Sequence, residues 1–353
     1  MNASPTTLIP STTSVETEEI SACPNCSSKK LELWCRAYDR LHKSSQQKFI
    51  YSRCKECNLV FLSVRPVETE VYKFYPENYG PYQGTLNQRL QPDINLSDER
   101  SLGDRQKYQY VRQILKTSFK TSKASLKSLP FKNFTSEIQE FYQPIGKAAK
   151  LLDFGCGSAQ FLNEARKQGW NTLGMDFSEQ AVEQASQNGH KALQVSPTVW
   201  NEIEDESLDF VRMNHVLEHL YHPKPVLTAI GRKMKPGAIL HIAVPNPHGI
   251  SSQVFRSQWW GLECPRHIML YSPSVLKDFL IQLGFSNFKV FHESITKDFA
   301  RSLGYFLYDR GRISSHEVEA MMQRKFLSAQ LYIPMKIAAI CKAADRFHIF
   351  AKK

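Results

Sequence analysis

Two closely spaced cysteine pairs near the N-terminus are the residues best suited to bind a metal. They stand in the stretches CPNC and CKEC. One such turn can present two thiolates to an ion, and two turns together complete a tetrahedral site. Four thiolates leave no open coordination position, so a site of this kind is structural. We therefore predict a structural Zn²⁺ held by Cys23, Cys26, Cys54 and Cys57.

Two other uses of these cysteines fit the sequence less well. A disulfide framework is typical of secreted chains, but the other cysteines are scattered and no signal peptide is recognisable. Redox C-x-x-C chemistry is usually found beside a βαβ unit, and neither pair lies in such a pattern. The residues between the pairs can form an extended hairpin. The predicted module is therefore a zinc ribbon at residues 21–66.

A second signature consists of two glycines in the stretch LLDFGCGSAQFL. Gly155 and Gly157 follow a short apolar run, and residues without side chains let the backbone approach a ligand closely. Asp153 precedes them. Asp176 ends the next apolar run, about 20 residues further on, where a carboxylate can bind two ribose hydroxyls. The pattern predicts a nucleoside-containing cofactor at this loop.

Two kinds of cofactor could use this arrangement. A nicotinamide or flavin dinucleotide is the usual ligand of a G-x-G-x-x-G loop, but Gln160 stands at the position of the third glycine. The carboxylate of Asp153 also suits an ammonium group better than a diphosphate. A ligand with a ribose, an adenine and a cationic amino-acid end matches all three features. S-adenosylmethionine is such a ligand.

A histidine-rich stretch, NHVLEHL, contains candidate catalytic residues. His215, Glu218 and His219 are three and four residues apart, so they share a face if a helix begins there. Imidazole titrates near neutral pH and could take a proton from an acceptor hydroxyl. His267, in WWGLECPRHIML, is a second candidate base. Glu218 would then orient a histidine or a substrate hydroxyl, and the alternative is that Glu218 and His219 only anchor the helix.

The segment around His267 offers further residues that could contact an acceptor. Trp259 and Trp260 could stack on a sugar ring, or they could simply pack the loop. Arg266 could bind a phosphate, which would suit a nucleotide sugar. The sequence leaves these alternatives open.

From residue 149 onwards, short apolar runs alternate with amphipathic segments that end at glycine, such as those closed by Gly169 and Gly189. Strands that alternate with helices form a parallel sheet covered on both faces. We therefore predict an α/β fold, a Rossmann-like doubly wound sheet with its ligand at the carboxyl ends of the strands. A helical C-terminal tail should follow and end in an edge strand, HIFAKK.

Four parts are expected along the chain. They are a disordered leader at 1–20, the zinc ribbon at 21–66, a linker and helical region on the substrate side at 67–148, and the cofactor-binding domain at 149–353. Within the linker, the sequence predicts a helix at 98–119 and a polar, basic loop at 120–136.

Composition limits the possible partners. The 353 residues carry a formal net charge of +11, and 42% of them are apolar. That apolar share suffices for a core, and the charge is compatible with an anionic partner or simply with a basic surface. No apolar run reaches the roughly 18 to 20 residues of a membrane-spanning helix. A cytoplasmic location is therefore expected.

Residues 150–294 resemble the class I S-adenosylmethionine-dependent methyltransferases. The matching motifs are LLDFGCGSAQFL, GMDFS, SLDFVRMNHVLEHL, MKPGAILHIAVPN and PRHIMLYSPSVLKDFLIQLGF. The cysteine-rich segment resembles the zinc ribbon fused to one branch of that family, many of whose members act on sugars, polysaccharide precursors or secondary metabolites. The resemblance implies a cofactor pocket of Asp153, Gly155 and Gly157 at the methionine end, Asp176 at the ribose, Phe177 beside the adenine, and Asn214.

Two departures from the family pattern matter. Sugar C-methyltransferases with this ribbon usually carry a further large C-terminal domain, and here only a short tail follows. The related ubiquinone-pathway O-methyltransferases have Glu, Glu and His in the segment aligned with HVLEH, and some use a divalent metal there. This chain has His215, Glu218 and His219 in that segment, so base and metal roles both stay open.

The leading hypothesis is methyl transfer from S-adenosylmethionine to a small molecule, namely a saccharide, a nucleotide sugar or a precursor of a polysaccharide or secondary metabolite. The alternative is an RNA-modifying methyltransferase that binds RNA through the ribbon and the basic linker. Against it, no Asn-Pro-Pro-Tyr motif follows the predicted fourth strand, where NHVLEH stands. A non-catalytic binding module would require a damaged cofactor loop, and this loop is intact.

Overall fold

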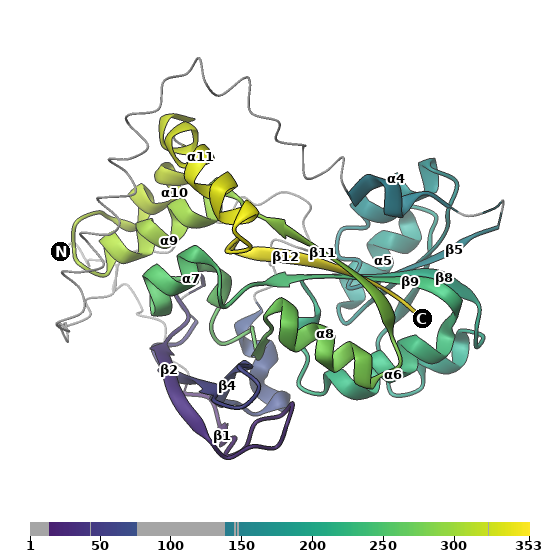
Figure 1. Cartoon of the computed structure of the whole chain (residues 1–353), viewed down its shortest axis with the longest axis horizontal. Helices are drawn as coiled ribbons and strands as arrows, with labels where there is room; N and C mark the ends of the chain where they lie inside the picture. The colour runs from purple at the N-terminus through teal and green to yellow at the C-terminus, as the bar shows by residue number, and fades with distance from the viewer. Residues whose placement is uncertain (1–13, 43, 76–137, 145, 147, 324) are drawn as a thin grey trace, which may run out of the picture.

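The computed structural model describes residues 14–42, 44–75, 138–144, 146, 148–323 and 325–353 (Figure 1). In this part of the chain the strands form two sheets, one of seven strands and one of five. The helix expected at 98–119 and the loop expected at 120–136 lie outside the described residues.

The large sheet has the order β11-β12-β9-β8-β5-β6-β7. Strands β5 to β9 are parallel, whereas β12 runs antiparallel to both of its neighbours. The central strands are buried on both faces, which explains their nearly continuous apolar sequences. The strands are β5 (Lys150–Phe154), β6 (Asn171–Asp176), β7 (Lys191–Gln194), β8 (Leu208–Asn214), β9 (Met234–Pro245), β11 (Ser286–Glu293) and β12 (Arg346–Lys352).

Four helices alternate with these strands, as the sequence predicts. Two of them begin at a serine N-cap, because the Oγ atoms of Ser178 and Ser272 accept backbone N–H groups in the first turn. Helices α4 and α5 contact β6, α6 contacts β9, and α8 contacts β11 and β12. The helices are α4 (Gln160–Lys167), α5 (Glu179–Gln187), α6 (Pro223–Lys233) and α8 (Pro273–Gln282).

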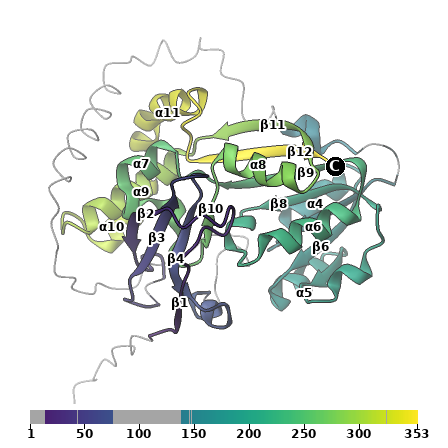
Figure 2. The same cartoon turned by 60° about the horizontal axis from the view of Figure 1, so that its bottom comes forward.

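The C-terminal helices lie at the opposite end of the molecule from α4 and α5 (Figures 1 and 2). They are α9 (Thr296–Tyr308), α10 (Ser315–Gln323) and α11 (Lys325–Ile340), and α9 packs on the short α7 (Ile250–Phe255). In the described part of the chain, no helix has both the length and the apolar character needed to cross a membrane.

The expectation of a C-terminal edge strand is wrong. β12 lies between β9 and β11, and its residues Phe347 to Ala351 are buried. A strand with apolar residues on both faces is more stable inside the sheet, where its faces and its backbone groups are covered, than at the edge. The helices α9 to α11 are therefore an insertion between two neighbouring strands.

The small sheet has the order β1-β4-β3-β2, and β10 pairs with β4 as well. Its first strand corrects the predicted leader, because residues 17–19 pair with β4 and Glu18 forms an ion pair with Arg65 over 2.7 Å. The strands are β1 (Thr17–Glu19), β2 (Leu31–Ala37), β3 (Phe49–Cys54), β4 (Val60–Pro66) and β10 (Met269–Leu270). A 3-10 helix, η1 (Glu68–Phe74), follows β4, which ends at Pro66.

Strand β10 joins the two sheets. It comes from the segment between β9 and α8, and Met269 and Leu270 pair antiparallel with Phe61 and Val60 of β4. The buried apolar side chains of the ribbon and of the large sheet accordingly form one continuous core. The N-terminal module is thus built into the larger domain (Figure 2).

Candidate functional site

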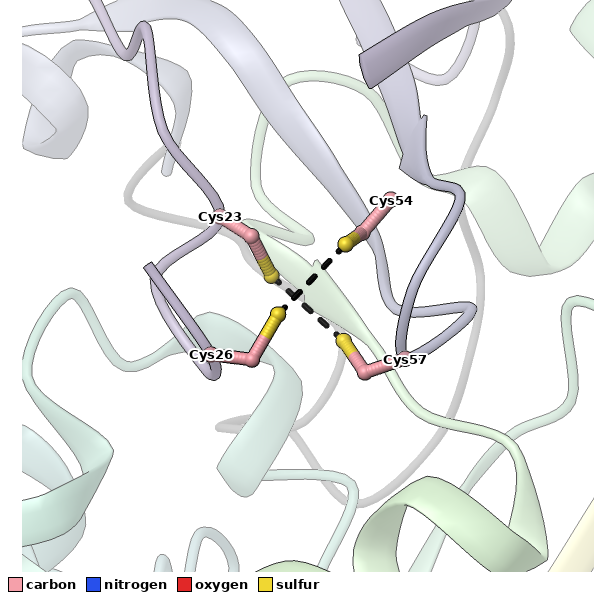
Figure 3. A group of neighbouring side chains, drawn as sticks. All are labelled: Cys23, Cys26, Cys54 and Cys57. Carbon is pink, nitrogen blue, oxygen red and sulfur yellow. Dashed lines mark hydrogen bonds between the residues drawn. The ribbon is translucent and has the colours of Figure 1, made fainter. Parts of the chain in front are cut away.

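The four predicted metal ligands converge in the structure (Figure 3). The Sγ atoms of Cys23 and Cys57 lie 3.5 Å apart, as do those of Cys26 and Cys54, and all four lie within 4.8 Å of one another. Thiolates at about 2.3 Å from a tetrahedral Zn²⁺ stand roughly 3.8 Å apart, so the donor set fits this ion. The separations exceed the length of a disulfide bond, which is about 2.05 Å.

One of these thiols, that of Cys54, has a lowered pKa. Burial acts against the thiolate of Cys54, but hydrogen bonds from the backbone N–H groups of Cys57 and Glu56 and from the thiols of Cys26 and Cys23 lower the pKa of Cys54 to about 7. Cys35 is buried in β2 and does not belong to the cluster. The geometry is compatible with a zinc ribbon.

The glycine loop folds back onto the end of β6. Gly155 and Cys156 both donate their N–H groups to the carbonyl of Met175. Gly155 has φ +81°, and a Cβ at this position would overlap Cγ2 of Val216. The glycine is therefore required by the backbone conformation and by close packing of the segment after β8.

Asp176 holds this loop from the end of β6. Its Oδ2 accepts the N–H of Gly157 and its Oδ1 accepts the N–H of Ser178, each over 2.9 Å. Burial raises the pKa of its carboxyl, and these N–H groups oppose the rise. Each carboxylate oxygen has two lone pairs, so both oxygens can still accept a ribose hydroxyl.

Asp153 has a partner that sequence reasoning missed. Arg212 lies opposite it on β8, and Nη1 of Arg212 donates to Oδ1 of Asp153 over 2.9 Å. The guanidinium also lies 4.0 Å from the ring centroid of Phe161. The two residues stand on neighbouring strands, but only the strand register shows that they pair. The contact between Asp153 and a ligand ammonium stays a prediction.

The remaining cofactor candidates lie at the same edge of the sheet. Phe177 follows β6 and is 52% exposed, so its ring is available to a ligand, and Asn214 ends β8. All six predicted cofactor residues therefore stand at the carboxyl ends of three adjacent strands, β5, β6 and β8. Their contacts with a cofactor remain predictions.

The histidine-rich stretch after β8 forms a single 3-10 turn, η4 (Leu217–His219), and α6 begins only at Pro223. Nδ1 of His219 lies 3.1 Å from the carbonyl oxygen of Arg266, and Nδ1 of His267 lies 2.8 Å from that of Gly261. A carbonyl only accepts, so a hydrogen on Nδ1 satisfies both contacts, and Nδ1 of His219 also lies 3.0 Å from the hydroxyl of Tyr75. In this tautomer the Nε2 atoms are acceptors.

Glu218 completes this group. It is fully buried, its Oε1 lies 3.2 Å from Nδ1 of His215, and its Oε2 has no hydrogen-bond partner in the described part of the chain. Glu218, His219 and His267 each offer one atom that could bind a metal ion, and these atoms lie within 4.8 Å of one another. Three side chains from two segments that are distant in sequence thus bring lone pairs together.

Burial controls the ionisation of this group. It lowers the pKa of His219 and the pKa of His267 to about 4, and it raises the pKa of Glu218. Both imidazoles are therefore neutral at pH 7, so the expected titration near neutral pH is wrong. Desolvation, which the sequence does not show, is the reason.

The other candidates in the His267 segment are packing residues. Trp259 is 2% exposed and makes an edge contact with Trp34, and the guanidinium of Arg301 lies 3.7 Å from the ring centroid of Trp260. Arg266 is fully buried and pairs with Asp39 of the ribbon over 3.1 Å. Neither the stacking role nor the phosphate role is available in this arrangement.

A small cavity lies beside these residues. It is lined by residues from the ribbon, the His267 segment and α9, and its volume is about 20 Å³. A cavity of this size holds a water molecule, because one water needs about 10–15 Å³. It is too small for a sugar ring.

The ribbon holds the His267 segment directly. Tyr51 of β3 donates its hydroxyl to the carbonyl of His267 over 2.9 Å, and the N–H of Leu62 donates to the carbonyl of Ile268. The N–H of Ile268 in turn donates to the carbonyl of Glu218 over 2.7 Å. A chain of hydrogen bonds therefore runs from the ribbon to both halves of the Glu218, His219 and His267 group.

Comparisons with known proteins agree with this geometry. Residues 127–290 match the family model described as a methyltransferase domain. A ubiquinone biosynthesis O-methyltransferase of Aliivibrio fischeri is 29% identical over 112 residues, which cover 30% of this chain and 47% of the relative. A protein of the same name from Hahella chejuensis is 30% identical over 103 residues, which cover 28% of this chain and 43% of the relative.

This chain thus spans less than half the length of these curated relatives. Among solved structures, a SAM-dependent methyltransferase from Archaeoglobus fulgidus aligns with a TM-score of 0.43 at 22% identity, over 62% of this chain and 92% of that one. The family match over residues 127–290, the strand order and the loop after β5 together support an S-adenosylmethionine-dependent methyltransferase.

Proposed function

We propose that this chain transfers the methyl group of S-adenosylmethionine to a hydroxyl oxygen of a small molecule. One observation carries the proposal. Glu218, His219 and His267 each bring one possible ligand atom to within 4.8 Å of the others, and the buried Oε2 of Glu218 has no hydrogen-bond partner in the described part of the chain. Buried acceptors without donors are costly, so the group suits a ligand that brings a donor. A hydroxyl is such a ligand.

The sulfonium of the cofactor is already a good leaving group. The protein therefore has to align the acceptor oxygen, the methyl carbon and the sulfur, and to remove the hydroxyl proton as the new C–O bond forms. Gly155, Gly157 and Asp176 would hold the cofactor at the ends of β5 and β6. The segment after β8 would present the acceptor.

Glu218 is the better proton acceptor in this group. A proton released among the three side chains goes to the one with the highest pKa, and burial raises that of Glu218 while lowering those of both histidines. The sequence-based assignment therefore changes. We assign the base role to Glu218 and the role of orienting the hydroxyl to His219 and His267.

The same three side chains fit a divalent cation. Two imidazole nitrogens and a carboxylate oxygen suit a transition metal, and each histidine already donates its Nδ1 hydrogen to a backbone carbonyl, as metal-bound histidines do. A bound cation would supply Lewis-acid polarisation of the acceptor hydroxyl. Glu218, His219 and His267 would hold it.

Two classes of acceptor are to be compared. The two curated relatives reported above are O-methyltransferases, which supports a hydroxyl acceptor, and the resemblance of the ribbon favours a saccharide or a nucleotide sugar. The alternative, RNA, needs a ribbon surface that is open to a nucleic acid. Strand β4 and Tyr51 of the ribbon instead contact the His267 segment.

Incubation with methyl-labelled S-adenosylmethionine and separate pools of nucleotide sugars, lipid-linked glycans, small phenols and total RNA tests the proposal. We expect label in a small molecule as a methyl ether, and we expect Glu218→Gln to abolish most of it. Label confined to RNA, or label on nitrogen, would reject the proposal. Calorimetric binding of S-adenosylmethionine by the same preparation confirms that the protein is folded.

A further inference from the structure

Arg346 lies beyond the candidate catalytic group but is connected to it by hydrogen bonds. Its Nη1 lies 3.2 Å from Nε2 of His215, and Nδ1 of His215 lies 3.2 Å from Oε1 of Glu218. On its other side, Nε of Arg346 donates to Oδ2 of Asp298 over 2.7 Å. A continuous line therefore runs from Asp298 on α9 through Arg346 and His215 to Glu218.

The direction of each hydrogen bond in this line follows from chemistry. A guanidinium has only donors, so Nε2 of His215 must be the acceptor in its contact with Arg346. A neutral imidazole has a single N–H, which therefore lies on Nδ1 of His215. This N–H donates to Glu218, so Oε1 of Glu218 is occupied as an acceptor. This contact therefore holds the carboxylate of Glu218 by its Oε1 atom.

We propose that Arg346 is a positioning residue for methyl transfer, because it fixes the Nδ1–H tautomer of His215 and thereby the orientation of the Glu218 carboxylate within the group formed with His219 and His267. Oε2 of Glu218 has no hydrogen-bond partner in the described part of the chain, and Glu218 belongs to the group formed with His219 and His267. The proposal rests on the proposed function, in which Glu218, His219 and His267 face the acceptor hydroxyl.

The fold explains how a residue so distant in sequence reaches this place. β12 is inserted beside β9, and Arg346 lies opposite Pro245 at the end of β9. The N–H of His215 donates to Ala243 on the same strand over 2.9 Å. His215 has φ +56°, a left-handed conformation that is uncommon for a residue with a side chain. Strained backbone of this kind is typical of functional positions.

The test combines two substitutions. Arg346→Leu removes the donor and lets His215 take either tautomer, so we expect kcat to fall about tenfold with little change in KM. Arg346→Lys keeps a donor and should retain most of the activity. His215→Asn places an amide nitrogen near the position of Nδ1, where it can donate to Glu218 without help from Arg346. In that background, Arg346→Leu should have almost no further effect on kcat.

Nitrogen-15 NMR of the histidine side chains supplies a readout that needs no acceptor substrate. The signal of His215 is assigned by its loss in His215→Asn. We expect the Nδ1–H tautomer in the wild type and a mixture in Arg346→Leu. Lys352→Leu, on the exposed end of β12, is the matched control and should change neither tautomer nor kcat.

Two results would overturn the proposal. One is an Nε2–H tautomer of His215 in the wild type, and the other is full additivity of the two substitutions. Thermal unfolding of each variant identifies any loss of kcat that comes from misfolding. The tautomer is measured without turnover. Failure to find a methyl acceptor would therefore count against the proposed function, while the NMR result would still show whether Arg346 fixes the tautomer of His215.

Discussion

The rings of His219 and His267 are in edge contact, with their centroids 4.6 Å apart. At this separation no substrate fits between the two rings, so the two histidines do not face an acceptor from opposite sides. They form one wall, and Glu218 lies beside them. An acceptor hydroxyl would therefore approach all three side chains from the same side.

This arrangement predicts how substitutions in the group combine. Glu218→Gln should lower kcat by about 10²-fold, because it removes the proton acceptor while keeping the shape of the side chain. His219→Ala and His267→Ala should each lower kcat by a similar factor, with the affinity for S-adenosylmethionine nearly unchanged. Steady-state kinetics and calorimetry measure the two effects separately.

Contact between the histidines adds a further expectation. The double variant of His219 and His267 should lose less activity than the product of the two single losses, since each ring depends on the other. His222→Ala is a suitable control, because this side chain is 71% exposed and lies outside the group. Activity losses that match the losses in folded protein would show that the histidines are structural and that catalysis rests on alignment alone.

A buried carboxyl near Arg346 predicts a pH dependence of stability. Asp345 accepts the N–H and the hydroxyl of Ser251 at the start of α7, and burial raises its pKa to about 7. Between about pH 4 and pH 7 the folded state therefore holds a proton on Asp345 that the unfolded state releases. Protonation then favours the folded state, so this contribution to stability increases as the pH falls from about 7 towards 4.

The variant Asp345→Asn isolates this effect, since asparagine does not titrate. Urea unfolding of both proteins at several pH values gives the difference in their free energies of unfolding. We expect this difference to move in favour of the wild type as the pH falls. A difference that is independent of pH would show that Asp345 stays ionised in the folded protein.

Features encoded in neighbouring residues could be predicted from the sequence. The alternation of strands and helices, the serine caps of α5 and α8, and the meeting of the two C-x-x-C turns all follow from local patterns. The internal position of β12 could not be predicted from local patterns, because it depends on pairing with β9 and β11, which are distant in the chain. The strand β1 was missed since its polar residues become ordered only through pairing with β4.

The site shows the same division. The cofactor residues could be placed at the ends of β5, β6 and β8, because the strand pattern carries them there. The pairs Arg212–Asp153, Arg266–Asp39 and Arg346–His215 join residues that are far apart in the chain. Such pairs depend on strand register and on the packing of the ribbon. The lowered pKa values of the histidines likewise come from burial, which no local pattern reports.

The cofactor prediction concerns Asp176. Asp176→Ala should weaken the binding of S-adenosylmethionine by roughly 2 to 3 kcal/mol, because it removes a pair of hydrogen bonds to the ribose and the support of Gly157. Calorimetry should show S-adenosylmethionine and its demethylated product at one site and no binding of NAD. Glu179→Ala, in the exposed first turn of α5, should leave the affinity unchanged. Preferential binding of NAD would contradict the cofactor assignment.

The zinc prediction links metal content to catalysis. Purified protein should contain one Zn²⁺ per chain, Cys54→Ser should lose it, and Cys35→Ser should retain it, because Cys35 lies outside the cluster. Loss of the metal should loosen β3 and β4, since structural zinc binding is coupled to local folding. Strand β4 pairs with β10, and Tyr51 of β3 binds the carbonyl of His267, so the His267 segment should loosen with them.

We therefore expect Cys54→Ser to lose methyl transfer while it keeps its affinity for S-adenosylmethionine, whose proposed site lies on β5, β6 and β8. Tyr51→Phe is the matched test in the presence of metal. It removes only the hydroxyl that holds His267, and it should lower kcat without changing the zinc content. If the metal-free variant instead methylates small molecules normally and loses only RNA binding, the ribbon serves nucleic-acid recognition and its contact with the His267 segment is incidental to catalysis.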